Sequence, residues 1–144
     1  MSLQHILVAY DESDGSHEAL LFAADLASQN PQMKVDIVYV VPIPLLDQKQ
    51  EESFRDILDM MISDGEDLLA DAIEKLGSPI DAQFDSLLLS GTSPATEILK
   101  LLEERPDYDL IIVGNRGLTG RREMMGSVSL KILNGAHIPV LIVK

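Results

Sequence analysis

Apolar runs of strand length alternate with longer segments of helical periodicity along the whole chain, and this alternation restricts the fold more than any other feature. Four of the runs are rich in Ile, Val and Leu with few polar interruptions, which is typical of parallel strands covered on both faces. The third run mixes polar and apolar residues and therefore predicts an edge strand. The five predicted strands are Leu3–Ala9, Val35–Val41, Ala82–Leu89, Leu110–Val113 and Pro139–Val143. We expect an α/β fold with a doubly wound, mostly parallel sheet and right-handed crossovers.

The segments between the strands have the apolar spacing and the end signals of helices. The predicted helices are Ser16–Ser28, about Glu51–Leu76, Pro94–Glu104 and Ser127–Leu133. The first is preceded by Asp14-Gly15-Ser16, which offers capping residue types. Ser93 is the expected cap of the third helix, with Pro94 at its first position. Gly65 lies inside the second helix and predicts a weak point there.

Length and composition exclude several classes of protein. The 144 residues are enough for one domain, residues 1–144, and the longest apolar runs are too short for a membrane span. There are no cysteines, and the N-terminus lacks a basic segment and a long apolar stretch, so we expect a cytoplasmic protein. A net charge of −13 argues against binding to nucleic acid. His5, His17 and His137 have no carboxylate or second histidine at ligand spacing, so we expect no metal site.

The last quarter of the chain has the pattern of a phosphate site. A strand that ends at Val113 runs into a glycine-rich basic loop, and Gly126-Ser127 opens a short helix. Backbone N–H groups and the helix dipole converge on an anion in such an arrangement. From Ile111 onward there are five basic residues and one acidic residue, within a chain of 11 basic and 24 acidic residues. Anion binding is one interpretation, and the other is a surface loop whose arginines keep it soluble or pair with the acidic body.

The order of the strands predicts where a ligand would lie. The first and fourth runs are the most apolar and are the expected central neighbours of the sheet. Their carboxyl ends carry Ala9-Tyr10-Asp11 and Gly114-Asn115-Arg116. Ligands of doubly wound sheets bind beyond the carboxyl ends of the strands, where the strand order reverses. We therefore expect a cleft with a carboxylate on one wall and the basic glycine loop on the other.

Four stretches of this sequence resemble the universal stress protein family, and together they cover essentially the whole chain. They are ILVAYDESDGSHEALLFAADLA, VDIVYVV, GTSPATEILKLLEERPDYDLIIVGNRG and GSVSLKILNGAHIPVLIVK. The resemblance implies a five-stranded parallel sheet of order 3-2-1-4-5 with helices on both faces, which is the adenine-nucleotide α-hydrolase-like fold. It also implies a homodimer formed through Pro139–Val143, since an exposed apolar edge strand otherwise invites aggregation. A crossing helix that covers this edge is the alternative.

ATP-binding members of that family have Gly, two residues, Gly, nine residues and then Gly-Ser or Gly-Thr. Gly114 and Gly117 are similar to the first part of this pattern, and Gly126-Ser127 to its end. The eight residues between Gly117 and Gly126 are one fewer than the pattern. Gly120 gives this loop conformational freedom that would absorb the difference; alternatively, the shorter loop tightens the phosphate cradle.

The resemblance implies a nucleotide site with an adenine side and a phosphate side. Asp11 would accept hydrogen bonds from the base or ribose, unless it only caps a turn before the first helix. Ser127 would be the N-cap of the last helix and could also bind phosphate. The charge pattern, apart from the resemblance, suggests that Arg116, Arg121 and Arg122 close over the phosphates. The full predicted set is Ala9, Tyr10, Asp11, Val40, Val113, Gly114, Asn115, Arg116, Gly117, Gly126, Ser127, Val128 and Ser129.

Three functions remain open at this point. The first is a dimeric stress-response or signalling protein that binds ATP with Mg²⁺ and acts on an unknown protein partner. The second is a member of the same family that binds no nucleotide and acts through protein–protein interaction. The third is an adenylyl-transferring enzyme, which would need an HxGH or SGGxDS motif that is absent here. GxGxxG, GxxxxGK[ST] and GxSxG motifs are also absent, so we expect no enzyme beyond slow ATP hydrolysis.

Overall fold

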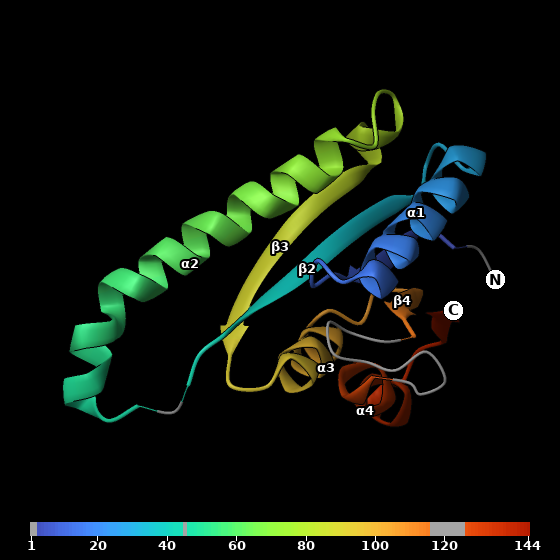
Figure 1. The fold of residues 1–144 in the computed structure, drawn as a ribbon. Coiled ribbons are helices and arrows are strands. Elements are labelled where there is room, and N and C mark those ends of the chain that lie inside the picture. Colours follow the sequence, from blue (N-terminus) through green and yellow to red (C-terminus); the bar gives the residue numbers. More distant parts are fainter. Residues whose placement is uncertain (1–2, 45, 116–125) are drawn as a thin grey trace.

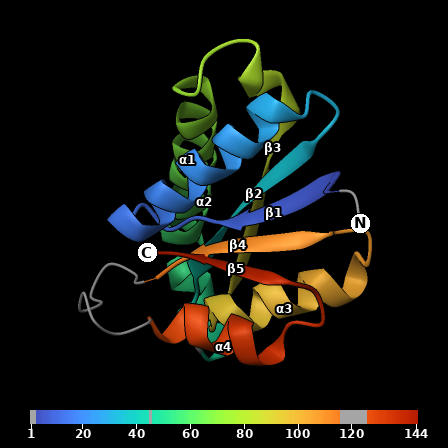
Figure 2. The same cartoon turned by 90° about the vertical axis from the view of Figure 1, so that its right-hand side faces the viewer.

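The chain folds around one parallel sheet (Figure 1), whose strand order is β3-β2-β1-β4-β5 (Figure 2). The computed structural model describes residues 3–44, 46–115 and 126–144. Every strand pairs in parallel with its neighbours. The strands are β1 (His5–Ala9), β2 (Lys34–Pro42), β3 (Phe84–Gly91), β4 (Leu110–Gly114) and β5 (Val140–Val143). The order 3-2-1-4-5, the central pairing of β1 with β4 and the edge position of β3 are confirmed.

In the described ranges, four α-helices cover the sheet, two on each face. They are α1 (Asp14–Gln29), α2 (Gln48–Glu74), α3 (Pro94–Glu104) and α4 (Ser127–Gly135). α1 and α2 pack on one face, and α3 and α4 pack on the other (Figure 2). Because side chains alternate along a strand, Ile6 and Val8 of β1 enter the first layer and Leu7 enters the second. All three are fully buried, as expected for a central strand of a parallel sheet.

Three element boundaries differ from the sequence prediction because polar groups set them. α1 begins at Asp14, two residues early, since the N-cap is Ser13, whose hydroxyl accepts the N–H of Ser16. α2 begins at Gln48 because Asp47 and Gln50 form a reciprocal capping box at its start. β3 begins two residues late, since Ile80–Gln83 forms a 3₁₀ turn. None of the helices within the described ranges is both long enough and apolar enough to cross a membrane.

Gly65 does not weaken α2, contrary to the sequence prediction. The helix is continuous through Gly65, which is buried against Tyr39 of β2 and Leu88 of β3. A Cβ built on Gly65 would lie 2.9 Å from Cδ1 of Leu88 and 3.5 Å from Cδ1 of Tyr39. The absent side chain therefore lets the long helix approach the edge of the sheet closely.

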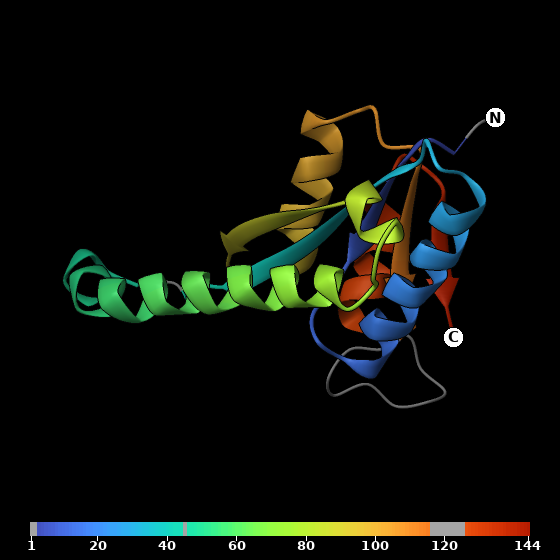
Figure 3. The ribbon, with the colours of Figure 1, turned by 90° about the horizontal axis from the view of Figure 1, so that it is seen from above.

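The N-terminal part of α2 runs on past the end of β3, as Figure 3 shows. Tyr39 lies three residues before Pro42, the last residue of β2, which corresponds to about 10 Å of strand. A helix covers that distance in about seven residues. By this estimate the first ten or so residues of α2, from Gln48 to about Ile57, extend beyond the strands. Ile57 lies near this point and Met60 lies one turn closer to Gly65, and they have 52% and 63% of their surface exposed.

We predict that Gly65→Leu destabilises the protein by about 1–3 kcal/mol, because three extra carbon atoms beyond Cβ must enter a filled contact. Gly65→Ala is the matched control. Its helix propensity gain of up to about 1 kcal/mol offsets the contact with the flexible end of Leu88, so we expect little net change. Urea denaturation followed by circular dichroism measures both. Equal stabilities of the Leu and Ala variants would show that α2 does not pack closely at this point.

Candidate functional site

The carboxyl ends of β1 and β4 lie side by side, at the point where the strand order reverses. Val8 of β1 is in register with Ile112 of β4, so the residues that follow the two strands emerge together. On the other side of β1, the N–H of Tyr10 donates to the carbonyl of Val38 at 2.9 Å. The structure thus brings Ala9-Tyr10-Asp11 and Gly114-Asn115 to one end of the sheet, as predicted.

The turn between β1 and α1 is held by its own polar side chains. The carboxylate of Asp11 accepts the N–H of Ser13 at 2.9 Å, and the N–H of Asp11 donates to Oγ of Ser16 at 3.1 Å. Glu12 between them has a φ of 67°, in the left-handed region that non-glycine residues rarely adopt. Asp11 thus caps this turn, and its side chain is exposed.

Gly114 lies where the end of β4 meets the start of α1. A Cβ built there would be 2.4 Å from the carbonyl carbon of Gly15 and 2.5 Å from its oxygen. No side chain fits at that distance, because the opposing atoms are backbone. The predicted glycine is therefore required, and its partner Gly15 was not predicted.

The end of β4 is joined to the start of α4 by hydrogen bonds from both sides of the intervening loop. Oγ of Ser129 donates to the carbonyl of Gly114 at 2.6 Å, and this bond is buried. The N–H of Gly126 donates to the carbonyl of Asn115 at 2.7 Å, and the N–H of Asn115 donates to the carbonyl of Val143 at 2.9 Å. These bonds fix the first turn of α4 beside the carboxyl end of β4.

The first turn of α4 has backbone donors without a capping side chain. Its N-cap is Gly126, and the first helical hydrogen bond runs from the N–H of Leu130 to the carbonyl of Gly126. The amides of Ser127, Val128 and Ser129 therefore have no carbonyl partner within the helix. By contrast, α1, α2 and α3 are capped by the side chains of their N-cap residues. The prediction of Ser127 as N-cap is wrong: it is the first helical residue, since the chain is already extended at Gly126.

Two tyrosines beside this end of the sheet are held in their neutral form. Burial raises the pKa of the Tyr10 phenol above its ordinary value, and the carboxylate of Glu12 raises it further. Burial also raises the pKa of Tyr39, again with Glu12 and then Asp11 as further causes. The β1 side of the site thus carries negative charge and neutral phenols, whereas the α4 side offers N–H donors.

The remaining predicted residues differ in what they can contribute. Val40, Val113 and Ser129 are buried, while Val128 is half-buried and Ser127 is exposed. Val40 lies near the end of β2, in register with Leu89 of β3. Arg116, Gly117, Gly120, Arg121 and Arg122 lie outside the described residues.

Sequence analysis did not identify two residues whose hydrogen bonds hold the turn between β1 and α1. Ser13 and Ser16 are both buried, and their hydrogen bonds shape the turn that presents Asp11. Their signal was the stretch Asp11-Glu12-Ser13-Asp14-Gly15-Ser16, in which each polar residue is a capping or turn type. Several such residues in a row leave the position of the helix start ambiguous.

Along the sequence, no carboxylate lies at ligand spacing from a histidine, but the fold brings two carboxylates close to one histidine. The fold brings Asp36 and Asp107 to the imidazole of His5, at the opposite end of the sheet from Asp11. Within the described ranges, however, no three His, Asp or Glu side chains converge on a point that would hold a metal ion.

Comparison with known proteins identifies relatives of the whole chain. The profile of the universal stress protein family matches residues 2–144. Universal stress protein MJ0531 of Methanocaldococcus jannaschii is 32% identical over 141 residues, which cover 96% of this chain and 81% of that protein. Universal stress protein YxiE of Bacillus subtilis is 34% identical over 148 residues, which cover 96% of this chain and 97% of that protein.

Solved structures of the same family share the fold. UspA from Lactobacillus plantarum superposes with a TM-score of 0.86 at 20% identity, covering 100% of this chain and 99% of that one. A universal stress protein in complex with cAMP has a TM-score of 0.64 at 23% identity, with 100% and 98% covered. The universal stress protein from Archaeoglobus fulgidus in complex with dAMP has a TM-score of 0.59 at 24% identity, with both chains fully covered.

We predict opposite outcomes for two serine substitutions in α4. Ser129→Ala removes the buried hydrogen bond to the carbonyl of Gly114 and should destabilise the protein by about 1–2 kcal/mol. Ser127→Ala should change stability by less than about 0.5 kcal/mol, because Ser127 is exposed and is not the N-cap. Thermal and urea denaturation measure both. A loss of about 1 kcal/mol in Ser127→Ala would instead support an N-cap role for this residue.

Proposed function

This chain belongs to the universal stress protein family, and we propose that it binds ATP with Mg²⁺ where β1, β4 and α4 meet. The observation that carries the proposal is the uncapped first turn of α4, held beside Gly114. The amides of Ser127, Val128 and Ser129 and the hydroxyl of Ser127 are suited to phosphate oxygens. A phosphate at this point also benefits from the positive end of the helix dipole.

The residues of the described ranges fit the two halves of such a ligand. On the phosphate side, Gly126 lacks a side chain that would occupy the position of the anion. On the adenine side, Asp11 would accept a hydrogen bond from the base or ribose, and Val40 would contribute backbone groups. Mg²⁺ would be held mainly by phosphate oxygens and water, since it usually keeps several waters and needs few protein ligands. The bound Mg²⁺ would neutralise phosphate charge next to the carboxylates of Asp11 and Glu12.

Two structural relatives support an adenine nucleotide as the ligand class. One is a universal stress protein in complex with cAMP, and the other is the Archaeoglobus fulgidus protein in complex with dAMP. Both proteins share the fold of this chain, and each of the two ligands contains an adenine base and a phosphate group. We propose ATP for this chain because Gly114, Gly117 and Gly126-Ser127 resemble the motif of the ATP-binding members.

We propose that the nucleotide regulates the protein and is turned over slowly or not at all. Rapid hydrolysis needs a positioned general base or nucleophile near the phosphates. In the part of the site that the structure describes, the carboxylate of Asp11 accepts the N–H of Ser13, and the hydroxyl of Ser129 donates to the carbonyl of Gly114. The role that fits is a stress-response or signalling module whose state depends on bound nucleotide.

We further propose a homodimer through β5, which is an edge strand of the sheet. The four residues of Val140–Val143 are apolar and half-buried. The two helices that contact β5 from opposite faces also carry exposed apolar side chains: Leu21 and Phe22 on α1, and Leu130 and Leu133 on α4. A second copy on this edge would cover the strand and extend the sheet.

A nucleotide-independent interaction protein is the second candidate function, and one observation favours it. The N-terminal part of α2 extends past the sheet (Figure 3), and Ile57 and Met60 of this helix are exposed. An amphipathic helix that presents apolar side chains away from its own core can enter a groove of a partner protein. The surrounding acidic residues of α2 would favour a partner with a basic rim.

Calorimetric titration of the protein with ATP and Mg²⁺ tests the nucleotide site. We predict micromolar binding by the wild type and at least a tenfold loss in Gly126→Val, because a branched side chain would occupy the position of the phosphate. Ser28→Val is the matched control: Ser28 is exposed near the end of α1, away from the site. Circular dichroism checks that both variants are folded.

The possible outcomes separate the two candidate functions. Binding that Gly126→Val abolishes and Ser28→Val preserves supports the site at α4. Equal binding by all three proteins would place the nucleotide elsewhere. No binding by the folded wild type at millimolar ATP would favour the nucleotide-independent function.

Sedimentation equilibrium of an edge-strand variant tests the proposed dimer. The backbone N–H and C=O groups of successive residues in a strand point to opposite sides. Because the carbonyls of Pro139 and Val143 accept N–H groups on the β4 side, the N–H and C=O groups of Ile142 point to the free edge. We predict that Ile142→Pro converts a dimer into a monomer, because proline removes an outward donor without breaking a β4–β5 hydrogen bond. A wild type that is monomeric at micromolar concentration, or a variant that stays dimeric, would contradict pairing through β5.

A further inference from the structure

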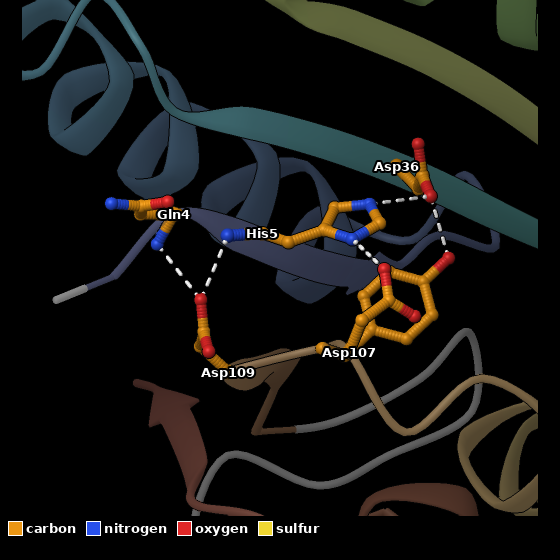
Figure 4. A network of polar contacts seen from close by, with 6 residues as sticks. Gln4, His5, Asp36, Asp107 and Asp109 are labelled. Carbon is orange, nitrogen blue, oxygen red and sulfur yellow. Dashed lines mark hydrogen bonds and ion pairs between the residues drawn. The ribbon is translucent and has the colours of Figure 1, made fainter. Parts of the chain in front are cut away.

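A second cluster of titratable side chains lies at the opposite end of the sheet from the proposed nucleotide site. His5 begins β1, Asp36 lies on β2, and Asp107 and Tyr108 belong to the connection between α3 and β4. Figure 4 shows the imidazole of His5 between the two carboxylates. Nδ1 of His5 is 2.7 Å from Oδ2 of Asp107, and Nε2 is 3.0 Å from Oδ2 of Asp36. The cluster joins three segments that are distant in the sequence.

The geometry determines how many protons the cluster holds. An ionised carboxylate only accepts hydrogen bonds, whereas a neutral imidazole has one donor and one acceptor nitrogen. Both ring nitrogens of His5 face carboxylate oxygens, so two donated bonds require a doubly protonated ring. A neutral ring would satisfy both contacts only if one carboxyl group carried the proton instead. In either case, the trio His5, Asp36 and Asp107 contains one proton more than a neutral histidine beside two ionised carboxylates.

We propose that His5, Asp36 and Asp107 form a proton-dependent clamp, in which one bound proton ties the start of β1 to β2 and to the segment before β4. The clamp would strengthen the fold at acidic and neutral pH and release it at alkaline pH. It is independent of nucleotide binding, which involves the other end of the sheet.

Tyr108 fixes the acceptor on the β2 side of the clamp. Its hydroxyl donates to the same Oδ2 of Asp36 at 2.5 Å, and this bond is buried. Burial and the hydrogen bond to Asp36 both raise the pKa of Tyr108, so its hydroxyl remains a donor across the physiological range. The tyrosine and imidazole rings are also in contact, with centroids 4.4 Å apart. The orientation of the His5 ring is therefore set by packing as well as by charge.

Loss of the proton would leave a buried charge with fewer partners. The side chain of Asp36 is only 9% exposed, and its hydrogen-bond partners are Nε2 of His5 and the hydroxyl of Tyr108. Without the proton, a lone pair of the imidazole would face a carboxylate oxygen on one side. Burial of an ionised carboxylate with too few donors is costly, so the start of β1 should loosen.

The charged groups around His5 are mostly negative, which favours a bound proton. The hydrogen bond from His5 holds the pKa of Asp107 below its ordinary value, so this carboxylate stays ionised. Asp109 is also held ionised, since its carboxylate accepts the N–H groups of Gln4 and His5 at 2.9 Å each and its pKa is lowered. Two cations oppose them: Arg105 acts on Asp107, and Lys34 is the register partner of His5 on β2.

The sign of the pH effect follows from which state binds the proton more tightly. In the unfolded chain, the two carboxylates are separated from His5, so the clamp proton is held less tightly there. The stabilisation is therefore present while the folded clamp holds its proton and disappears as the pH rises and the proton leaves.

Nitrogen-15 NMR of the histidine rings tests the proton count directly. At pH 7, we expect both ring nitrogens of His5 to have the chemical shifts of protonated nitrogens, because each faces a carboxylate oxygen. A neutral single tautomer of His5 at pH 7 with ionised Asp36 and Asp107, measured by carboxyl carbon-13 shifts, would overturn the proposal. A protonated carboxyl group beside a neutral ring would support it, since the clamp would still hold its proton.

Urea denaturation between pH 6 and 9 tests the effect on stability. In the wild type, we expect the unfolding equilibrium constant to rise about tenfold over this range, because the folded state holds a proton that the unfolded chain releases. This pH dependence should be absent in His5→Gln and retained in the control His17→Gln. If His5→Gln does not fold, the exposed Asp107→Asn serves instead and should shift the pH dependence to lower pH. Identical profiles for the wild type and the clamp variants would contradict the proposal.

Discussion

The close approach of two glycine backbones, Gly114 at the end of β4 and Gly15 at the start of α1, is the contact on which the candidate site depends. A Cβ at Gly114 would lie 2.4 Å from the carbonyl carbon of Gly15. This approach lets the end of β4 reach the start of α1, next to the turn that contains Asp11. The hydrogen bond from Ser129 to the carbonyl of Gly114 then places α4 against the same point. β4, α1 and α4 thus converge at Gly114.

The two ends of the sheet use polar groups in opposite ways. At the carboxyl ends of the strands, the first turn of α4 has donors without a side-chain cap, and Glu12 adopts a strained left-handed conformation. At the other end, His5, Asp36 and Tyr108 satisfy one another, and the carboxylate of Asp109 accepts the N–H groups of Gln4 and His5 at the start of β1. Strain and unused donors are typical of functional ends of a fold. Mutual satisfaction of buried polar groups is typical of an end that maintains the fold.

Much of the fold could be predicted from the sequence because its signals are local and strong. The apolar runs gave the strands, and the polar character of the run before Leu89 identified β3 as an edge. Boundaries set by capping were missed, since Ser13, Asp14 and Ser16 are all plausible caps and only the three-dimensional turn selects Ser13. Gly65 was misinterpreted for a related reason: helix propensity describes an isolated helix, whereas this glycine allows contact with Tyr39 and Leu88. Of the site, the glycines and the strand ends were predictable, but Gly15 was not, because its role depends on a neighbour 99 residues away in the sequence.

An acidic protein that binds an anion needs its attraction to be local, and the arrangement of this chain is consistent with that need. The net charge of −13 repels a nucleotide at long range, and Asp11 and Glu12 lie close to the proposed site. Amides at a helix start act over a few ångströms, so they stabilise a phosphate that has already arrived without changing the net charge of the protein. Mg²⁺ would reduce the same repulsion by lowering the charge of the incoming nucleotide. In the proposed function, the acidic body would disfavour polyanions, which need a broad basic surface, while a few well-placed donors would still hold a single small nucleotide.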